Sequence, residues 1–256
     1  MKVVIFAGGY GSRISEESVL RPKPMIEIGG RPLLWHIMKI YMAHGFADFV
    51  ILLGYKGHAI KEYFFQYGIH SSDVTFDFAT GETTIHNTAA EKWRVTLVDT
   101  GEATMTGGRL KRVQSYLDPQ TPFLLTYGDA VSDVDLKALV ETHERAESLV
   151  TLTAVQPSGR FGHLAIDGNQ VTGFEEKPKT DGTWINGGFF VVSPKALDYV
   201  DGDACVWEAD SLPRIATEGK LAAHHHSGYW QCMDTMRDKA LLEEVWATGQ
   251  APWKQW

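Results

Sequence analysis

The chain has 256 residues, 44% of them hydrophobic and 11% aromatic, a composition that excludes an intrinsically disordered protein. Its formal charge is −8, from 32 acidic and 24 basic residues, and its densest basic cluster is the short run 109–113. These charges argue against nucleic acid as a partner, whereas a small anionic ligand needs only a few well-placed cations.

The cysteines and the N-terminus indicate the compartment. Cys205 and Cys232 are too few for a disulfide framework and lack metal-ligand spacing, so we expect a reduced, cytoplasmic protein. The apolar run Val3–Ala7 is too short for a signal peptide or a membrane span. It ends in glycines and is predicted to be the buried first strand of a parallel sheet.

Helical and strand patterns alternate in the first part of the chain. Apolar residues with helical spacing follow Pro32 and stop before Gly45, which predicts a helix with Pro in its first turn. Runs 49–53 and 58–66 then predict a second buried strand and a second helix. This alternation predicts a doubly wound, Rossmann-like mixed sheet that is mostly parallel and flanked by helices.

A different pattern occupies residues 68–101. Three short segments, 74–79, 83–86 and 94–98, largely alternate apolar and polar side chains, as antiparallel strands with one wet face do. We predict a small antiparallel β excursion at the edge of the sheet or at a subunit contact.

The remaining elements follow to the C-terminus. Helices are predicted at 110–117, 136–146 and 236–246, strands at 122–126, 149–155 and 184–192, and a hairpin at 162–174 with its turn at 167–169. Because the sequence has no internal repeat or linker, residues 1–256 are predicted to form a single domain.

A glycine-rich loop, Gly8-Gly9-Tyr10-Gly11-Ser12-Arg13, follows the first strand directly. Its glycines let backbone amides converge on an anion, and Arg13 and Lys23 offer cations. The pattern GxxxxGKS/T is absent, and the dinucleotide pattern GxGxxG lacks its third glycine because Ile14 stands there. The loop alone predicts either an anion site or a tight turn with solvated cations.

Two aspartates are candidate ligands for magnesium, which prefers oxygen ligands and needs only one or two carboxylates beside substrate phosphates. Asp129 follows a predicted strand, at the sheet edge where ligand sites of open α/β sheets gather. Asp234 precedes the predicted helix 236–246. A solvated turn for Asp129 and a helix N-cap for Asp234 are the alternatives.

Other polar positions have weaker signals. Glu176 and Lys177 stand before Pro178, as in an ordinary surface turn. Asn186 can hydrogen-bond hydroxyl groups, and Gly187 admits a close ligand.

Thr104 and Arg109 lie in the segment just before a predicted helix, which favours a phosphate or base contact or else an ordinary loop with a solvated arginine. Trp207 and Glu208 are predicted to line a site or to begin a helix. The histidines 224–226 lie in a predicted strand, where at most two could share a metal, so a surface strand is favoured.

Together, Phe6-Ala7-Gly8-Gly9-Tyr10-Gly11-Ser12-Arg13 and Arg21-Pro22-Lys23-Pro24-Met25 resemble the signature of the sugar-phosphate nucleotidyltransferases, with Ile14 in place of the usual leucine. The Glu-Lys-Pro motif at 176–178 and the two aspartates match further motifs of that family in the same order. The resemblance implies the nucleotide-diphospho-sugar transferase fold.

The resemblance also implies roles for individual residues. A nucleotide would contact Phe6, Ala7, Gly8, Gly9, Tyr10, Gly11, Ser12, Arg13, Lys23, Thr104, Arg109 and Gly128. The sugar phosphate would contact Glu176, Lys177, Asn186 and Gly187, and one Mg²⁺ would bind Asp129 and Asp234. The implied catalytic residues are Arg13, Lys23, Asp129 and Lys177. Ala130 follows Asp129 where close relatives have glycine, which puts substrate tolerance in doubt.

Segments 32–39, 54–57, 72–76, 95–101 and 251–254 are similar to one branch of the family, the glucose-1-phosphate cytidylyltransferases. This similarity implies a homo-oligomer in which glucose 1-phosphate attacks the α-phosphorus of CTP in line, giving CDP-glucose and pyrophosphate. The alternatives are another base or sugar (UTP, dTTP or a different hexose 1-phosphate), a non-catalytic nucleotide-sugar-binding protein, and a triphosphate hydrolase.

Overall fold

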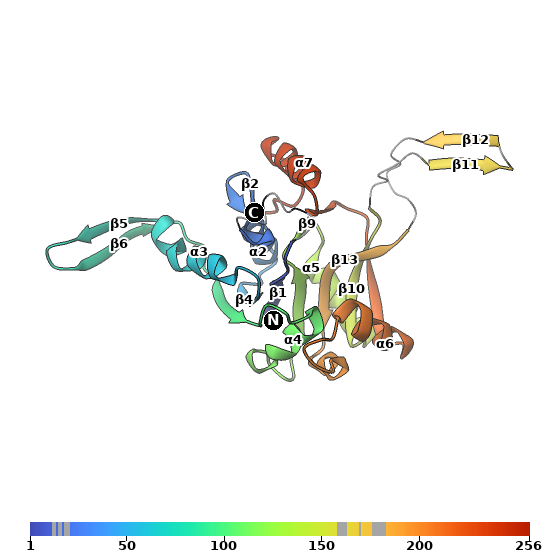
Figure 1. Cartoon of the computed structure of the whole chain (residues 1–256), viewed down its shortest axis with the longest axis horizontal. Helices are drawn as coiled ribbons and strands as arrows, with labels where there is room; N and C mark the ends of the chain where they lie inside the picture. The colour runs from blue at the N-terminus through green and yellow to red at the C-terminus, as the bar shows by residue number, and fades with distance from the viewer. Residues whose placement is uncertain (12–13, 15–16, 18–20, 158–162, 169, 176–182) are drawn as a thin grey trace.

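Seven strands form one mixed sheet at the centre of the molecule (Figure 1). The computed structural model describes residues 1–256 except 12, 13, 15, 16, 18–20, 158–162, 169 and 176–182. The strand order is β14-β10-β13-β8-β1-β4-β7. Strand β13 runs antiparallel to both of its neighbours, and the other neighbouring pairs are parallel, so the predicted mixed, mostly parallel sheet is confirmed.

The sheet strands are β1 (Val3–Ala7), β4 (Asp48–Leu53), β7 (Arg94–Asp99), β8 (Phe123–Tyr127), β10 (Val150–Val155), β13 (Ile185–Val192) and β14 (Leu221–His226). Among the described residues, the α-helices are α2 (Leu33–Ala43), α3 (Gly57–His70), α4 (Thr106–Arg112), α5 (Leu136–Ala146), α6 (Leu212–Thr217) and α7 (Met236–Ala247). No helix among the described residues is long and apolar enough to cross a membrane.

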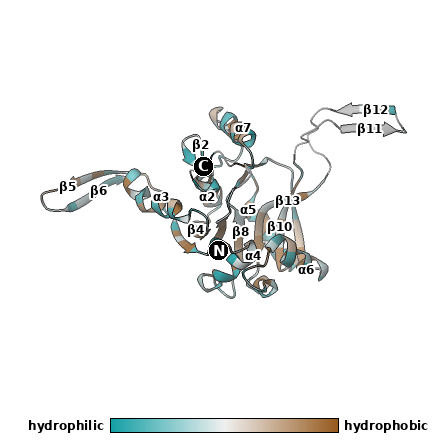
Figure 2. Cartoon of the chain, viewed as in Figure 1, coloured by the Kyte–Doolittle hydropathy of each residue, from teal (hydrophilic) through white to brown (hydrophobic). Residues whose placement is uncertain are grey.

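Side chains of β1 enter two separate cores because successive residues of a strand point to opposite faces. Val3 and Ile5 pack in a core built with α2, α3, α5 and α7. Val4 and Phe6 pack in a second core with α4 and α6. The strand is therefore covered on both faces, as its continuous apolar run predicts, and Figure 2 shows hydrophobic residues concentrated in the central strands.

The excursion predicted at 68–101 is smaller in the structure. Strands β5 (Ser72–Asp77) and β6 (Glu82–Thr88) form an antiparallel hairpin that projects from the end of α3 (Figure 1). The third predicted segment, 94–98, was wrongly assigned to the excursion, because β7 pairs parallel with β4 at the edge of the main sheet. As an edge strand, β7 is only partly covered, so its sequence can mix polar and apolar side chains as an antiparallel strand with one wet face does.

Another difference concerns α4, which begins at Thr106 rather than at the predicted Leu110 and is followed by a short 3₁₀ turn, η3 (Gln114–Tyr116). Gly107 and Gly108 hid its start, because glycine is a poor helix former. Both are buried against the segment 203–205, and a Cβ on either would lie under 3.0 Å from backbone atoms there. The glycines thus allow close packing of the helix.

Several short elements complete the fold. Hairpin β11 (His163–Asp167) and β12 (Gln170–Glu175) projects at the opposite end of the molecule from β5 and β6, as Figure 1 shows. Its pairing agrees with the predicted hairpin at 162–174. The remaining short elements are β2 (Glu27–Ile28), β3 (Arg31–Pro32), β9 (Ala130–Ser132), β15 (Trp230–Cys232), the 3₁₀ turns η2 (Lys23–Met25) and η4 (Pro194–Tyr199), and the π-helical turn η5 (Trp207–Ser211).

Candidate active site

The candidate site lies where the parallel strands end. Strands β1, β4, β7 and β8 run in the same direction, so their carboxyl ends meet at one edge of the sheet. A cavity of about 630 Å³ opens there, large enough for a small-molecule ligand. The chain enters it at Gly8 after β1 and at Gly128 after β8.

Most residues predicted to bind the nucleotide line this one cavity. They are Phe6, Ala7, Gly8, Gly9, Tyr10, Gly11, Lys23, Thr104, Arg109 and Gly128. Ser12 and Arg13 lie outside the described residues.

The buried side chain of Arg109 anchors the glycine loop. Its Nη2 donates to the carbonyl oxygen of Gly8 at 3.1 Å, and its Nη1 donates to the carbonyls of Leu53 at 3.0 Å and Gly101 at 2.7 Å. One buried guanidinium therefore ties together the ends of β1, β4 and β7. Since the side chain is buried, a solvated Arg109 is ruled out, and part of its task is to shape the loop.

Gly8 needs its missing side chain because of this packing. A Cβ at Gly8 would lie 2.5 Å from Nη1 of Arg109 and 2.9 Å from the backbone nitrogen of Gly54. Real Cβ atoms do not approach so closely, so the loop and the arginine fit only with glycine here. At the next position, Gly9, a Cβ would meet nothing within 4 Å.

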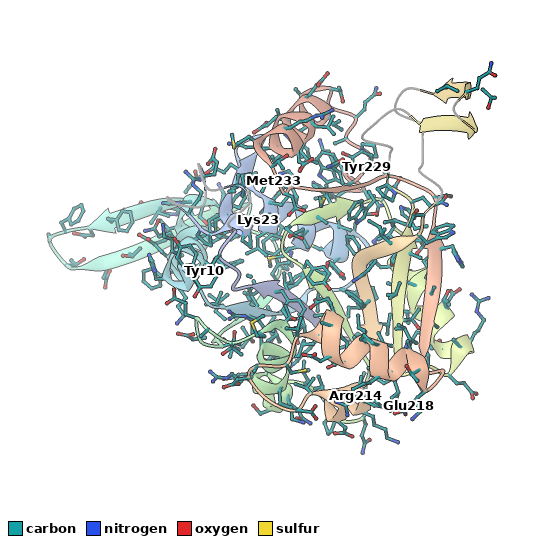
Figure 3. The ribbon with its side chains drawn as sticks, turned by 45° about the vertical axis from the view of Figure 1, so that its right-hand side comes forward. Tyr10, Lys23, Arg214, Glu218, Tyr229 and Met233 are labelled. Atoms are coloured by element: carbon teal, nitrogen blue, oxygen red, sulfur yellow. The ribbon has the colours of Figure 1, made fainter. Side chains whose placement is uncertain are left out.

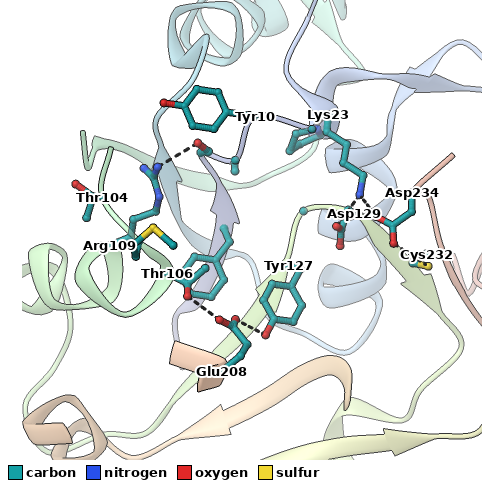
Figure 4. A pocket seen from close by; sticks show the side chains of 18 of the residues that line it. Tyr10, Lys23, Thr104, Thr106, Arg109, Tyr127, Asp129, Glu208, Cys232 and Asp234 are labelled. Atoms are coloured by element: carbon teal, nitrogen blue, oxygen red, sulfur yellow. Dashed lines mark hydrogen bonds and ion pairs between the residues drawn. The ribbon is translucent and has the colours of Figure 1, made fainter. Parts of the chain in front are cut away.

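Three charged side chains from distant parts of the sequence meet at one end of the cavity (Figure 4). The Nζ atom of Lys23 lies 2.8 Å from Oδ2 of Asp129 and 2.6 Å from Oδ1 of Asp234. The lysine side chain is only 12% exposed. Burial alone would lower the pKa of Lys23, but the two carboxylates outweigh burial and raise this pKa above its ordinary value.

Backbone pairing brings the two aspartates together. Strand β9 follows Asp129 and pairs antiparallel with β15, and the Met233 amide donates to the Asp129 carbonyl at 2.8 Å. Asp234 is therefore fixed next to Asp129 by the chain itself. Ala130 is buried in β9 and is not among the described residues that line the cavity.

Asp234 does not cap α7. Thr235 is the N-cap, its hydroxyl accepting from the Asp238 amide while the Asp238 carboxylate accepts from the Thr235 amide. This capping box satisfies the helix start without Asp234. The alternative that Asp234 serves as an N-cap is thus wrong, and its carboxylate faces Lys23.

On the predicted sugar side, Asn186 and Gly187 are not among the described residues that line the cavity. Asn186 contacts a residue that does line the cavity, because its Nδ2 donates to the Tyr127 hydroxyl at 3.4 Å. A Cβ on Gly187 would lie 2.8 Å from Cγ1 of Val155, so this glycine serves strand packing. Glu176 and Lys177 lie outside the described residues.

Comparison with known proteins decides the family. Residues 2–243 match the family model described as nucleotidyl transferase. The chain belongs to the nucleotidyl transferase family. The resemblance inferred from the sequence motifs is confirmed.

The similarity extends over the whole chain. Glucose-1-phosphate cytidylyltransferase from Salmonella typhi is 55% identical over 256 residues, which are 100% of both chains. "Probable glucose-1-phosphate cytidylyltransferase" from Bacillus subtilis (strain 168) is 41% identical over 257 residues, again 100% of each. The crystal structure of HddC from Yersinia pseudotuberculosis has a TM-score of 0.71 at 25% identity and covers 96% of this chain and 99% of that one.

Sequence patterns did not identify every residue around this nucleotidyl transferase cavity. The described residues that were not predicted to line it are Ile14, Pro24, Glu102, Ala103, Met105, Thr106, Tyr127, Trp230 and Cys232. Most of them neighbour predicted residues in the chain, which was the available signal. Glu208 lines the cavity and lies in a helical turn, as predicted for Trp207 and Glu208.

A second cavity, of about 590 Å³, surrounds Tyr199 away from the first, near the labelled Arg214 and Glu218 in Figure 3. Its charged groups largely neutralise one another: Lys220 pairs with Glu218 at 2.7 Å, and Arg214 pairs with Asp201 at 2.8 Å. The described residues of the glycine loop, with Lys23, Asp129 and Asp234, line the first cavity, where Lys23 and Tyr10 are labelled.

The three histidines 224–226 form part of β14, as predicted for a surface strand. His226 lies 2.9 Å from Oδ1 of Asp133, and His224 lies 3.0 Å from the Thr142 hydroxyl. Among the residues that the structure describes, no group of three or more His, Cys, Asp or Glu side chains is arranged to hold a metal ion.

Proposed function

We propose that this protein transfers a cytidylyl group from CTP to α-D-glucose 1-phosphate, giving CDP-glucose and pyrophosphate. The observation that carries the proposal is the meeting of Lys23, Asp129 and Asp234 beside a glycine loop, in a chain 55% identical over its full length to a glucose-1-phosphate cytidylyltransferase.

The carboxylate pair fits a magnesium ion. Asp129 and Asp234 direct one oxygen each at the same ammonium nitrogen, and this convergence of two carboxylates supports a cation site. Two carboxylates are enough for Mg²⁺, which keeps waters and takes substrate phosphate oxygens as its other ligands. Asp129 and Asp234 would hold the ion, and its charge would neutralise phosphate oxygens during transfer.

The other residues bind and orient the substrates. The amides of the loop 8–11, held by Arg109, would surround the triphosphate, and Arg13 and Lys23 would stabilise charge on the departing pyrophosphate. Lys177 and Glu176 would hold the incoming sugar phosphate, and Asn186 would contribute through its contact with Tyr127. A phosphate monoester is already ionised near neutral pH, so the reaction needs positioning and charge stabilisation rather than a general base.

We also infer that the excursion 68–101 contributes to a homo-oligomer. The β5–β6 hairpin presents Phe78 at 94% exposure and Phe76 at 48%, with Phe65 of α3 at 84%. Exposed aromatic side chains of this size are typical of association surfaces. Phe78→Ser should lower the molar mass measured by light scattering, and an unchanged mass would exclude the hairpin tip as a contact.

Pyrophosphate release with CTP, UTP, dTTP or GTP, each with and without glucose 1-phosphate, tests the proposal. We expect release with CTP that depends on the sugar phosphate. Faster release with UTP or dTTP would reassign the base. Release without sugar phosphate would indicate a hydrolase, and no release with any nucleotide would indicate a non-catalytic binding protein.

A further inference from the structure

Glu208 joins two walls of the cavity, and the mechanism above does not use it. Its Oε1 accepts a hydrogen bond from the Tyr127 hydroxyl at 2.6 Å, and its Oε2 accepts one from the Thr106 hydroxyl at 2.7 Å (Figure 4). Tyr127 is the last residue of β8, and Thr106 is the first residue of α4. Glu208 itself projects from the π-helical turn η5, a conformation that often marks functional positions.

The direction of the hydrogen bonds is fixed on the Tyr127 side. Oδ1 of Asn186 accepts from the Gly188 amide at 2.9 Å, so Nδ2 of Asn186 is the group that faces the Tyr127 hydroxyl and donates to it. The hydroxyl proton of Tyr127 then points to Glu208.

The direction is fixed on the Thr106 side too. The Thr106 hydroxyl accepts from the backbone amide of Trp207 at 2.9 Å, so its own proton points to Glu208. Glu208 therefore receives a donor on each oxygen. An ionised carboxylate accepts on both oxygens, whereas a glutamine has one acceptor oxygen and would leave one of the two hydroxyl protons unpaired.

Each arm of this network supports a part of the site. Tyr127 stacks on Phe6 of the nucleotide wall, with ring centroids 5.6 Å apart, and precedes Gly128 and Asp129 in the chain. Thr106 begins the helix that carries Arg109, the anchor of the glycine loop. Glu208 thus connects the turn that carries Asp129 to the helix that shapes the nucleotide loop.

We propose that Glu208 is a positioning residue of the transfer reaction, which sets the relative placement of the Asp129 turn and the α4 wall and, through Tyr127, orients Asn186. This inference rests on the proposed function, because it assigns Glu208 to the alignment of the two substrates. A displacement of about 1 Å at a reacting centre costs on the order of 100-fold in rate.

Steady-state kinetics of Glu208→Ala with CTP and glucose 1-phosphate tests the inference. We expect kcat to fall roughly 100-fold, because alignment is lost. In Glu208→Gln, Nε2 can donate to the second lone pair of the Thr106 oxygen, which leaves one hydroxyl proton unpaired, so a loss of only about 10-fold is expected, in line with one weakened hydrogen bond. If Glu208 only filled space, glutamine, which has nearly the same shape, would restore full activity, so a partial loss separates the two roles.

Asp210→Ala is the matched control. Asp210 belongs to the same turn and accepts from the Val206 amide at 2.7 Å, but it does not line the cavity. Its removal disturbs the turn without touching Tyr127 or Thr106, so kcat should stay within about twofold, as for an ordinary surface substitution.

A mutant cycle separates positioning through the two arms from a direct effect. If Glu208 acts through them, adding Glu208→Ala to the double variant Tyr127→Phe/Thr106→Val should lower kcat no further. Unchanged kcat in Glu208→Ala, an equal loss in Asp210→Ala, or multiplying losses in the cycle would overturn the inference. An inactive wild-type protein would instead refute the proposed function itself.

Discussion

Lys23 and Asp234, 211 positions apart in the sequence, form an ion pair of 2.6 Å at the end of the nucleotidyl transferase cavity. The same ammonium contacts Asp129, so it lies at the point where the proposed magnesium ligands converge. A divalent cation that binds there must displace Lys23. The lysine would then be released toward the phosphates of the nucleotide.

This relationship predicts that Lys23→Met separates metal binding from turnover. Without the resident ammonium, the two carboxylates repel each other, so the ligand-free variant should bind Mn²⁺ about tenfold more tightly or better, equivalent to roughly 1.4 kcal/mol. Turnover should fall by roughly 100-fold or more, as for the loss of one preorganised donor. Electron paramagnetic resonance of free Mn²⁺ measures the affinity without any substrate.

Lys39→Met is the control for that variant, because Lys39 is also partly buried and pairs with Glu91 at 3.3 Å, in a pair separate from the Asp129–Asp234 site. Its Mn²⁺ affinity should match that of the wild type. Weaker Mn²⁺ binding in Lys23→Met would show that the lysine does not compete with the metal.

Neighbouring residues at the start of α7 should have separable effects. Thr235→Ala removes the N-cap and should lower the free energy of unfolding by about 1 kcal/mol while keeping Mn²⁺ binding. Asp234→Asn should weaken Mn²⁺ binding at least tenfold, because a charged ligand is lost, with little effect on helix capping. Urea unfolding and the resonance titration measure the two quantities. If Thr235→Ala weakened Mn²⁺ binding and Asp234→Asn did not, the metal would bind elsewhere.

Adjacent glycines offer a second matched pair. Gly8→Ala places a methyl group against Arg109 and the Gly54 backbone and should destabilise the fold by about 1–3 kcal/mol. Gly9→Ala enters open space, so its free energy of unfolding should stay within about 0.5 kcal/mol of the wild type. Equal stability of both variants in urea unfolding would contradict the packing of Arg109 under the loop.

Buried His36 predicts a loss of stability in acid. Its Nε2 lies 2.9 Å from the Ile28 carbonyl oxygen, and its Nδ1 accepts from the Trp253 indole, so the neutral ring satisfies both contacts. Burial lowers the pKa of His36 from 6.5 to about 4. Because the folded pKa is depressed, the stabilising effect is complete above pH 6.5 and is lost as the pH falls toward 4, by about 3 kcal/mol in all.

Urea unfolding between pH 7 and pH 4 checks this prediction. The loss of unfolding free energy between pH 7 and pH 4 should be smaller in His36→Gln by about 3 kcal/mol. In the control His58→Gln, where the histidine is exposed, this loss should match that of the wild type. Identical slopes in the wild type and His36→Gln would show that His36 is not held neutral in the fold.

Much of the fold followed from patterns that depend on local physics. The apolar run of β1, the helix α5 and the glycine loop were predicted because burial, helical spacing and tight turns leave signals within a few residues. Strand β7 was misplaced because partner choice is decided by distant β4, which no local alternation records. The start of α4 was missed because its glycines are required by packing against residues 203–205, far away in sequence.

The candidate site shows the same limit. Lys23, Asp129 and Asp234 were identified from motifs, but their meeting on one ammonium depends on the pairing of β9 with β15, two strands of three residues each. The two hydrogen bonds of Glu208 likewise link residues 81 and 102 positions apart. Such contacts carry no periodic signal in a single sequence.

The most direct test of the proposed reaction follows the oxygen that forms the new bond. The protein is incubated with CTP, Mg²⁺ and glucose 1-phosphate that carries ¹⁸O in its non-bridging phosphate oxygens. Mass spectrometry then measures the masses of both products. We predict CDP-glucose that retains all of the label and pyrophosphate that carries none, because a sugar phosphate oxygen attacks the α-phosphorus of CTP. Label in pyrophosphate, or CMP in place of CDP-glucose, would contradict the account.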